Sequence, residues 1–436
     1  MKLKALFILL GIILTSFYYF PFSYVFFPVT NSKMMLAAIG LVILLIKLGW
    51  NGHQEINKDF FMVSLYALGI SFASLLTIVV NNSTDGAYLS YIVSMWVWTG
   101  AAYLIVNYIN AIHRRISVDL VCFYLIAVGV FQCLLSVLMG IYSPLQEFID
   151  GYFGGGFIEK YKERLHGIGC AFDTAGSRFA VLLVMIAFLL PRMFEREAPR
   201  THIIFLLSSF CFIAVIGNMI GRTTTIGLIM AICYWICYLL FHKTNHQHTK
   251  KQLYLWIGGF VFAIVFISIF LYNFNDQWHD YFRFGFEGFF SLVEKGRWEV
   301  SSNELLKQGM VFPDNFWTWI IGDGYIGGMA WDPYYQGPLW YGYYKGTDAG
   351  YSRFLFYFGL IGLIFFILFM TKVCRVCIKR FPSYQYMFVM ILLLNCFIWV
   401  KVSTDIFLAF APFLCISKEE NNASLETYND NGKYYE

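Results

Sequence analysis

The chain has 436 residues, of which 59% are hydrophobic and only 13% carry a charged side chain, and its mean hydropathy is +0.61. These values lie outside the range of soluble globular domains, so composition alone predicts an integral membrane protein. The formal net charge of +4 is small for this length and is spread over the loops, which argues against a nucleic-acid partner.

Apolar stretches long enough to cross a bilayer recur along the chain and predict about twelve transmembrane helices. The first follows Met1 to Lys4, and because no small-residue cleavage site comes after it, we interpret it as a helix and not as a signal peptide. The predicted spans are 5–27, 34–48, 60–80, 87–109, 118–141, 177–193, 202–217, 223–241, 253–272, 351–371, 384–400 and 405–417. The predicted fold class is therefore all-α, a polytopic integral membrane protein.

Lysine and arginine gather at every second junction between these spans, and the positive-inside rule places such junctions in the cytosol. They are Lys2, Lys4, Lys47, Lys58, Arg114, Arg115, Arg192, Arg196, Arg200, Lys243, Lys250, Lys251, Lys372, Arg375, Lys379 and Arg380. Both termini are then cytosolic. The chain divides into helices 1–9 over 1–273 with a smaller outer loop at 142–176, one large outer loop at 274–350, helices 10–12 over 351–417, and a tail at 418–436 whose polar composition predicts disorder.

Arg222 breaks this charge pattern, because it lies on an outward-facing turn, Gly217 to Thr225, where the next helix begins. The free N–H groups of a helix start, the guanidinium and three threonine hydroxyls together predict a site for an anionic group. An ordinary arginine reaching for lipid phosphate is the alternative.

Two further arginines lie in and after the smaller outer loop. Arg164 follows Lys160 and Lys162 in a mixed-charge stretch, and Arg178 sits just inside an apolar span. An ionisable group inside a span is a functional candidate, whereas the lysines read more simply as solvated surface.

The large outer loop is rich in Trp, Tyr, Phe and Gly, a composition that suits stacking on sugar rings or, alternatively, anchoring at the membrane interface. It contains Arg297 within Gly296-Arg297-Trp298. It closes on Asp348, followed by Tyr351 and Arg353 at the start of an apolar helix. Asp348 reads either as a proton acceptor or as a helix N-cap.

In order and position, these features resemble the membrane O-antigen polymerases (Wzy) and the related O-antigen ligases. The resemblance rests on Arg164 with Gly167, the Arg222 turn, Gly296-Arg297-Trp298, Gly322 with Gly324, and Asp348 before a glycine-bearing helix. The ligases typically carry His-Asn near the place of Thr347-Asp348. This departure favours the polymerases and leaves the ligase histidine without an occupant.

The resemblance implies a membrane glycosyltransferase at the periplasmic face of the bacterial inner membrane. It would transfer a growing glycan from undecaprenyl diphosphate to the nonreducing end of a new lipid-linked repeat unit, for an O-antigen or capsule-type polysaccharide. A chain-length regulator is an implied partner. We expect no cofactor and no metal, since the sequence lacks an Asp-x-Asp pair.

The same chemistry assigns roles to residues. A departing diphosphate needs its charge held, which we assign to Arg222 as a catalytic residue, with Arg164, Arg178 and Arg297 binding substrate. Asp348 is the candidate base, supported by the substrate-binding residues Tyr351 and Arg353. The alternatives are an O-antigen ligase and a polysaccharide-lipid flippase or other transporter. Transporters tend to place ionisable residues near mid-membrane, whereas the charges here gather at the outer ends.

Overall fold

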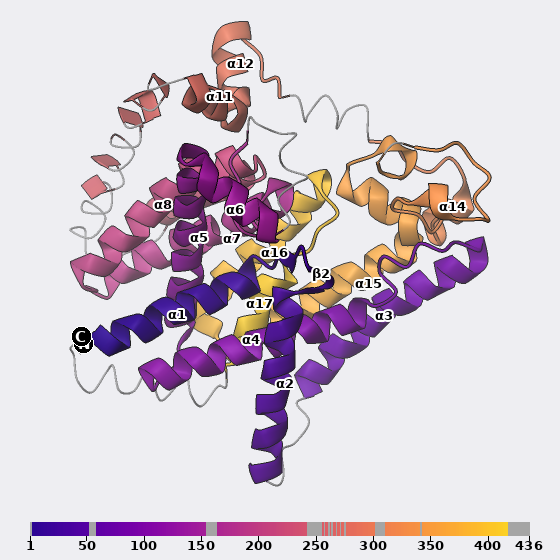
Figure 1. Cartoon of the computed structure of the whole chain (residues 1–436), viewed down its shortest axis with the longest axis horizontal. Coiled ribbons are helices and arrows are strands. Elements are labelled where there is room, and N and C mark those ends of the chain that lie inside the picture. Colours follow the sequence, from indigo (N-terminus) through magenta and orange to yellow (C-terminus); the bar gives the residue numbers. More distant parts are fainter. Residues whose placement is uncertain are drawn as a thin grey trace. The chain divides into compact units, whose positions relative to one another are not determined.

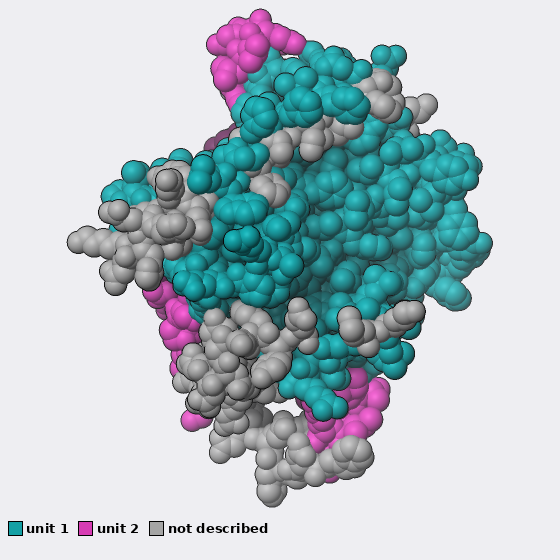
Figure 2. Space-filling model, turned by 90° about the vertical axis from the view of Figure 1, so that its left-hand side faces the viewer, with its two compact units in different colours: residues 1–40, 101–290, 415–436 teal, residues 41–100, 291–414 magenta. Residues whose placement is uncertain are grey.

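The computed structural model describes residues 2–51, 58–153, 164–241, 276–300, 310–340 and 342–416, together with 255–256, 258–259, 262, 265–266, 268–270 and 272–273. The predicted span at 253–272 is therefore described only in short pieces, and the predicted tail at 418–436 lies wholly outside the described residues. The chain forms two compact units, which Figure 2 colours separately: unit 1 comprises 1–40, 101–290 and 415–436, and unit 2 comprises 41–100 and 291–414.

Unit 1 is built mainly from α-helices (Figure 1). They are α1 (Lys2–Tyr19), α5 (Val118–Ile141), α6 (Ser143–Phe153), α7 (Phe172–Glu195), α8 (Arg200–Ile220), α9 (Thr224–Phe241) and α11 (Asp276–Gly285). Three more helices pass from one unit into the other: α2 (Ser32–Asn51), α4 (Tyr91–His113) and α12 (Glu287–Lys295). A short antiparallel hairpin of β1 (Ser23–Tyr24) and β2 (Phe27–Asn31) follows α1, with Ser23 opposite Asn31.

Helix α7 is the core of unit 1, because almost all of its residues from Ala175 to Phe194 are buried. It packs against α5, α8 and α9. The contact with α9 is close because a side chain on Gly227 would lie 2.3 Å from the Cα of Ala180. Small residues that let helix backbones approach in this way are typical of the contacts between transmembrane helices.

Unit 2 contains α3 (Lys58–Asn81), α14 (Phe316–Ile320), α15 (Gly350–Arg380), α16 (Gln385–Lys401) and α17 (Phe407–Leu414), and the 3-10 turns η2 (Met329–Trp331), η3 (Tyr344–Gly346) and η4 (Pro382–Tyr384). Helix α15 packs against α3, α14, α16 and α17. It is interrupted at Gly359, whose φ is +62° and where a Cβ would lie 2.3 Å from the carbonyl oxygen of Ile320. The break therefore lets the segment after α14 lie directly on the α15 backbone.

Among the described residues, eight helices are long and apolar enough to cross a membrane. They are α3, α4, α5, α7, α8, α9, α15 and α16, the last together with η4. The chain is thus an all-α, multi-pass membrane protein, and this part of the fold prediction is confirmed. The count of twelve stays a prediction. Helix α17, with 8 residues, is much shorter than the roughly 20 residues of a full span.

The first predicted span was wrong at its C-terminal end. It was expected to reach residue 27, but α1 ends at Tyr19 and the next residues enter the β1–β2 hairpin. Pro21 explains the difference, because a proline lacks an N–H and disfavours helical geometry in the residue before it. Within 142–176, residues 143–153 form α6 and α7 begins at Phe172, five residues before the expected start.

Candidate functional site

The turn that carries Arg222 is pressed against the start of α7. Helix α8 ends at Ile220 and α9 begins at Thr224, so Gly221 and its neighbours form a very short connection. A Cβ on Gly221 would lie 2.3 Å from the carbonyl oxygen of Phe172, and one on Gly176 would lie 2.7 Å from the carbonyl oxygen of Gly221. Glycine at both positions thus permits a backbone contact that fixes the turn.

The three threonine hydroxyls of this turn donate within the protein. Thr223 donates to Asp173 at 2.5 Å, and Thr225 donates to the side-chain oxygen of Asn218 at 2.6 Å. The Thr224 hydroxyl lies 2.8 Å from the carbonyl oxygen of Gly221. They were expected to help hold an anion, and the close packing of the turn instead uses them to satisfy buried acceptors. The backbone N–H groups of Thr224, Thr225 and Ile226 likewise donate to carbonyl oxygens of the turn. The guanidinium of Arg222 pairs with a carboxylate.

Arg222 is largely enclosed, with 12% of its side chain exposed, and it forms an ion pair with Glu287. Its guanidinium carbon also lies 4.6 Å from the centroid of the Phe284 ring. A cation over an aromatic face is attracted by the ring quadrupole, and the attraction grows when water is excluded. The arginine is therefore fixed in position by residues from the α11–α12 region.

Arg164 shares the same aromatic ring. Its guanidinium carbon lies 4.4 Å from the Phe284 centroid and 5.4 Å from that of Phe172. Both guanidinium carbons therefore lie within 4.6 Å of the centroid of this one ring. The structure thus brings together two of the arginines singled out from the sequence, with one carboxylate from Glu287 beside them.

Phe284 belongs to α11, and the packing of this helix on α8 places its ring beside the two arginines. Trp278, Tyr281, Phe282 and Gly285 are buried on one side of α11, and a Cβ on Gly285 would lie 3.2 Å from the backbone nitrogen of Met219. Sequence reasoning missed Phe284 and Glu287. The i, i+3, i+4, i+7 spacing of the buried positions is the signal for an amphipathic helix that could have found this region.

Arg178 lies elsewhere in unit 1, on α7 beside the C-terminal end of α1. Its guanidinium carbon is 5.6 Å from the centroid of the Phe20 ring, and the Tyr19 hydroxyl donates to its backbone carbonyl at 3.1 Å. These contacts give Arg178 a place in the packing between α1 and α7. Its assignment to substrate stays a prediction.

In unit 2, Arg297 is on the surface and pairs with Glu299 at 2.5 Å, with 74% of its side chain exposed. Lys295 contacts the same carboxylate at 2.7 Å. This local charge cluster is held in place by Ser291, whose hydroxyl donates to the Glu299 carbonyl oxygen at 2.7 Å. Its part in substrate binding also stays a prediction.

The start of α15 carries the other three predicted residues. Asp348 is exposed, and the N-cap position of the helix belongs to Ala349, whose N–H is bonded to the Thr347 hydroxyl at 3.2 Å. The Tyr351 hydroxyl donates to the Cys396 carbonyl at 3.0 Å. The guanidinium carbon of Arg353 lies 3.7 Å from the centroid of the Tyr343 ring. Tyr351 therefore ties α15 to α16, and Arg353 ties α15 to the end of the large loop.

The glycines of the Gly-x-Gly pattern are explained by packing. Gly322 has φ +83°, and a Cβ there would lie 2.4 Å from the carbonyl oxygen of Tyr357, so the loop backbone rests on α15. Gly324 has φ +82°, and its carbonyl oxygen accepts a 2.6 Å hydrogen bond from the hydroxyl of Ser83. This hydrogen bond joins the loop to the end of α3. The Gly322–Gly324 segment therefore positions the large loop on α15 and on the end of α3.

A buried carboxylate completes the folding of that loop. Asp332 accepts hydrogen bonds from the backbone of Thr84 at 2.7 Å, the backbone of Tyr334 at 2.8 Å and the hydroxyl of Tyr325 at 2.9 Å. Burial raises the pKa of Asp332, but these donors outweigh it and the pKa lies below its usual range. Burial, together with the hydrogen bond to Asp332, raises the pKa of Tyr325 to about 12.

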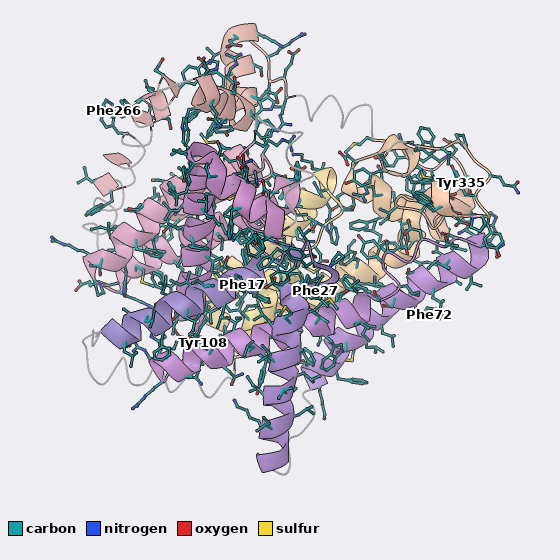
Figure 3. The ribbon with its side chains drawn as sticks, viewed as in Figure 1. Phe17, Phe27, Phe72, Tyr108, Phe266 and Tyr335 are labelled. Carbon is teal, nitrogen blue, oxygen red and sulfur yellow. The ribbon has the colours of Figure 1, made fainter. Side chains whose placement is uncertain are left out.

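Aromatic side chains form the small core of the loop around this carboxylate. Tyr325, Met329, Tyr344 and Phe356 are buried together, with Tyr335 packed against them (Figure 3). These residues give the described part of the loop next to α15 a small packed core of its own. Three or more His, Cys, Asp or Glu side chains do not come together in a metal-like group anywhere in the described part of the chain.

Comparison with protein-family models, with curated proteins and with solved structures finds no match to this chain. The resemblance to the O-antigen polymerases therefore rests on the residues quoted for it. The geometry of the site must carry any functional argument.

Proposed function

We propose that this chain polymerises lipid-linked oligosaccharide repeat units at the periplasmic face of a bacterial inner membrane, with both termini in the cytoplasm. The observation that supports the proposal best is the placement of Arg164 and Arg222 over one ring, that of Phe284. Two planar, permanently charged groups held against one ring suit a diphosphate, which presents several oxygens to bidentate donors.

We propose that this cluster binds an anionic group of the substrate in exchange for its internal partner. Arg222 pairs with Glu287, and their side chains are 12% and 34% exposed. A diphosphate that arrives as a leaving group gains negative charge in the transition state, and fixed cations in such a place stabilise that charge. We assign the Arg164–Arg222 pair to the undecaprenyl diphosphate of the donor substrate.

The proposed reaction is a displacement at the sugar carbon attached to the diphosphate. The hydroxyl oxygen of the nonreducing-end sugar of a new lipid-linked unit forms a bond to C1 of the donor glycan, and the bond from C1 to the diphosphate oxygen breaks. The leaving undecaprenyl diphosphate keeps the electron pair, and the hydroxyl proton passes to a carboxylate, for which we propose Asp348. A chain-length regulator is the proposed protein partner.

The test is reconstitution of the full-length protein with a purified lipid-linked repeat unit, without nucleotide and without an ion gradient. A ladder of polymer on the carrier lipid is the expected product. A protein that forms no ladder but moves the lipid-linked unit across a vesicle membrane is instead a flippase. Polymer transferred to lipid A core and not to a lipid-linked unit identifies a ligase.

A further inference from the structure

Unit 1 contains a pocket of about 200 Å³ between α6 and the segment that leads into α7. It is lined by the aromatic residues Phe22, Phe153 and Phe172, by Asp150, and by residues 167–171. Resting on the proposed function, we infer that this pocket binds the sugar ring attached directly to the donor diphosphate.

The carboxylate in the pocket is fixed by a buried partner. The Nε2 atom of His166 lies 3.1 Å and 3.2 Å from the two carboxylate oxygens of Asp150, and their side chains are 7% and 10% exposed. A carboxylate held in this way keeps lone pairs for other donors. Sugar hydroxyls are such donors, whereas an isoprenoid chain in the same space would leave the buried carboxylate without them.

The opposite wall is rigid. The turn from Gly167 to Cys170 is closed by two backbone hydrogen bonds of 2.8 Å and 3.3 Å. Gln132 donates to the carbonyl oxygen of Ile168 at 3.1 Å, and a Cβ on Gly169 would lie 2.6 Å from the carbonyl oxygens of Phe20 and Pro21. A preformed wall of this kind lowers the entropic cost of ligand binding.

The pocket and the arginine pair share one residue, Phe172. Phe172 lines the pocket, and the guanidinium carbon of Arg164 lies 5.4 Å from the centroid of its ring. One stretch, from Arg164 to Thr174, thus provides an arginine at one end and the pocket wall at the other. A ligand with its diphosphate on Arg164 and Arg222 would place its first sugar at this wall.

Size and surface fit one sugar residue. Pockets for drug-sized ligands enclose roughly 300–1,000 Å³, so this smaller pocket suits a single ring and not an oligosaccharide. Aromatic faces pack against the C–H faces of a pyranose while the carboxylate accepts its hydroxyl hydrogens. The pocket would therefore select the identity of the first sugar of the repeat unit.

The test compares binding of farnesyl diphosphate with binding of farnesyl diphosphate that carries one glucose, galactose or N-acetylglucosamine, using the purified full-length protein. In the wild type we expect at least one of the three sugars to raise the affinity about tenfold over farnesyl diphosphate alone. A hydrogen bond to a charged group contributes a gain of this size. Asp150→Asn and Ala171→Leu should lose this gain and keep the affinity for farnesyl diphosphate itself. Ala171 has φ −148°, so the larger side chain fits its backbone.

Glu147→Gln is the matched control, since Glu147 is an exposed carboxylate on the same helix α6 and is not part of the pocket wall. It should bind every ligand as the wild type does. If both pocket variants keep the full gain, or if none of the sugars gives a gain, the pocket assignment is overturned. A different result would overturn the diphosphate site. If Arg222→Lys leaves the affinity for farnesyl diphosphate unchanged, the arginine pair does not bind the diphosphate.

Discussion

The carboxylate of Glu287 forms an ion pair with the guanidinium of Arg222, so the residue proposed to hold a diphosphate already carries an internal anion. A substrate must compete with it. We expect Glu287→Gln to tighten binding of inorganic pyrophosphate, because the variant removes both the competing charge and its repulsion of the ligand. A partly exposed ion pair is worth about 1 kcal/mol or less, so the gain should be at most about fivefold.

Calorimetric titration of the purified protein at low ionic strength measures this gain, and added salt should shrink it. Glu294→Gln is the control, because Glu294 is an exposed carboxylate on the same helix α12. Unchanged pyrophosphate affinity in Glu287→Gln would show that Arg222 is not the anion site.

Phe284 holds both guanidinium groups, so its loss should affect two arginines at once. Each cation–π contact is worth about 0.5–1 kcal/mol, and we expect Phe284→Ala to weaken pyrophosphate binding by about five- to thirtyfold. Phe289→Ala is the matched control, because Phe289 lies nearby on α12 and is 48% exposed. Equal losses in the two variants would mean that the shared ring has no special role.

Arg222→Lys should lose most polymer formation while the protein is still made and inserted. A lysine keeps the charge but cannot reproduce the planar fork that binds a diphosphate through paired donors. Arg283→Lys is the control, since Arg283 lies on α11 with its guanidinium carbon 5.2 Å from the Phe290 centroid. Gel analysis of polymer length decides the matter, and wild-type length in Arg222→Lys contradicts the diphosphate role.

The sequence predicts the helices well because their signal is local: length and apolarity decide whether a stretch can cross a bilayer. It also picks out the Arg222 turn, since a charge in a short turn between two predicted spans is visible without tertiary structure. The partners of that turn are not visible. Phe284 and Glu287 reach Arg222 only because α11 packs on α8, and no spacing rule links such distant residues.

The Asp150–His166 pair was missed for the same reason. The partner of His166 lies on α6, a helix too short to register as a membrane span and followed by a polar stretch. The use of the threonine hydroxyls was not foreseen, because threonines at a helix start can donate either to an anion or to acceptors within the protein. Only the close approach of Gly221 to α7 decides between them.

The predicted orientation can be checked in spheroplasts. Tyr334 is 66% exposed in the large loop, so Tyr334→Cys should react with a membrane-impermeant maleimide. Asn245→Cys, in a junction that the charge pattern places in the cytosol, should react only after lysis. The comparison requires a background in which the exposed native residues Cys233 and Cys237 are replaced by serine. Labelling of Asn245→Cys alone in intact spheroplasts reverses the orientation.

The last prediction separates polymerase from ligase, and it depends on what each enzyme leaves behind when it is lost. Without a ligase, polymer stays on the carrier lipid and the lipid A core is bare. Without a polymerase, single repeat units are still ligated, so the core carries one unit and no ladder. We expect the second phenotype when this chain is deleted from a strain whose product is O-antigen. Bare core with long polymer on the carrier lipid would identify a ligase instead.

Asp348→Asn should reproduce the deletion phenotype at normal protein level if the carboxylate accepts the hydroxyl proton, because an amide of the same shape cannot take it. Helix capping is a poor rival explanation for such a loss, since Ala349 occupies the N-cap position and asparagine caps helices as well as aspartate does. Asp314→Asn, an exposed carboxylate in the same loop, should keep a full ladder. A full ladder in Asp348→Asn would remove Asp348 as the base while leaving the Arg164–Arg222 diphosphate site untouched.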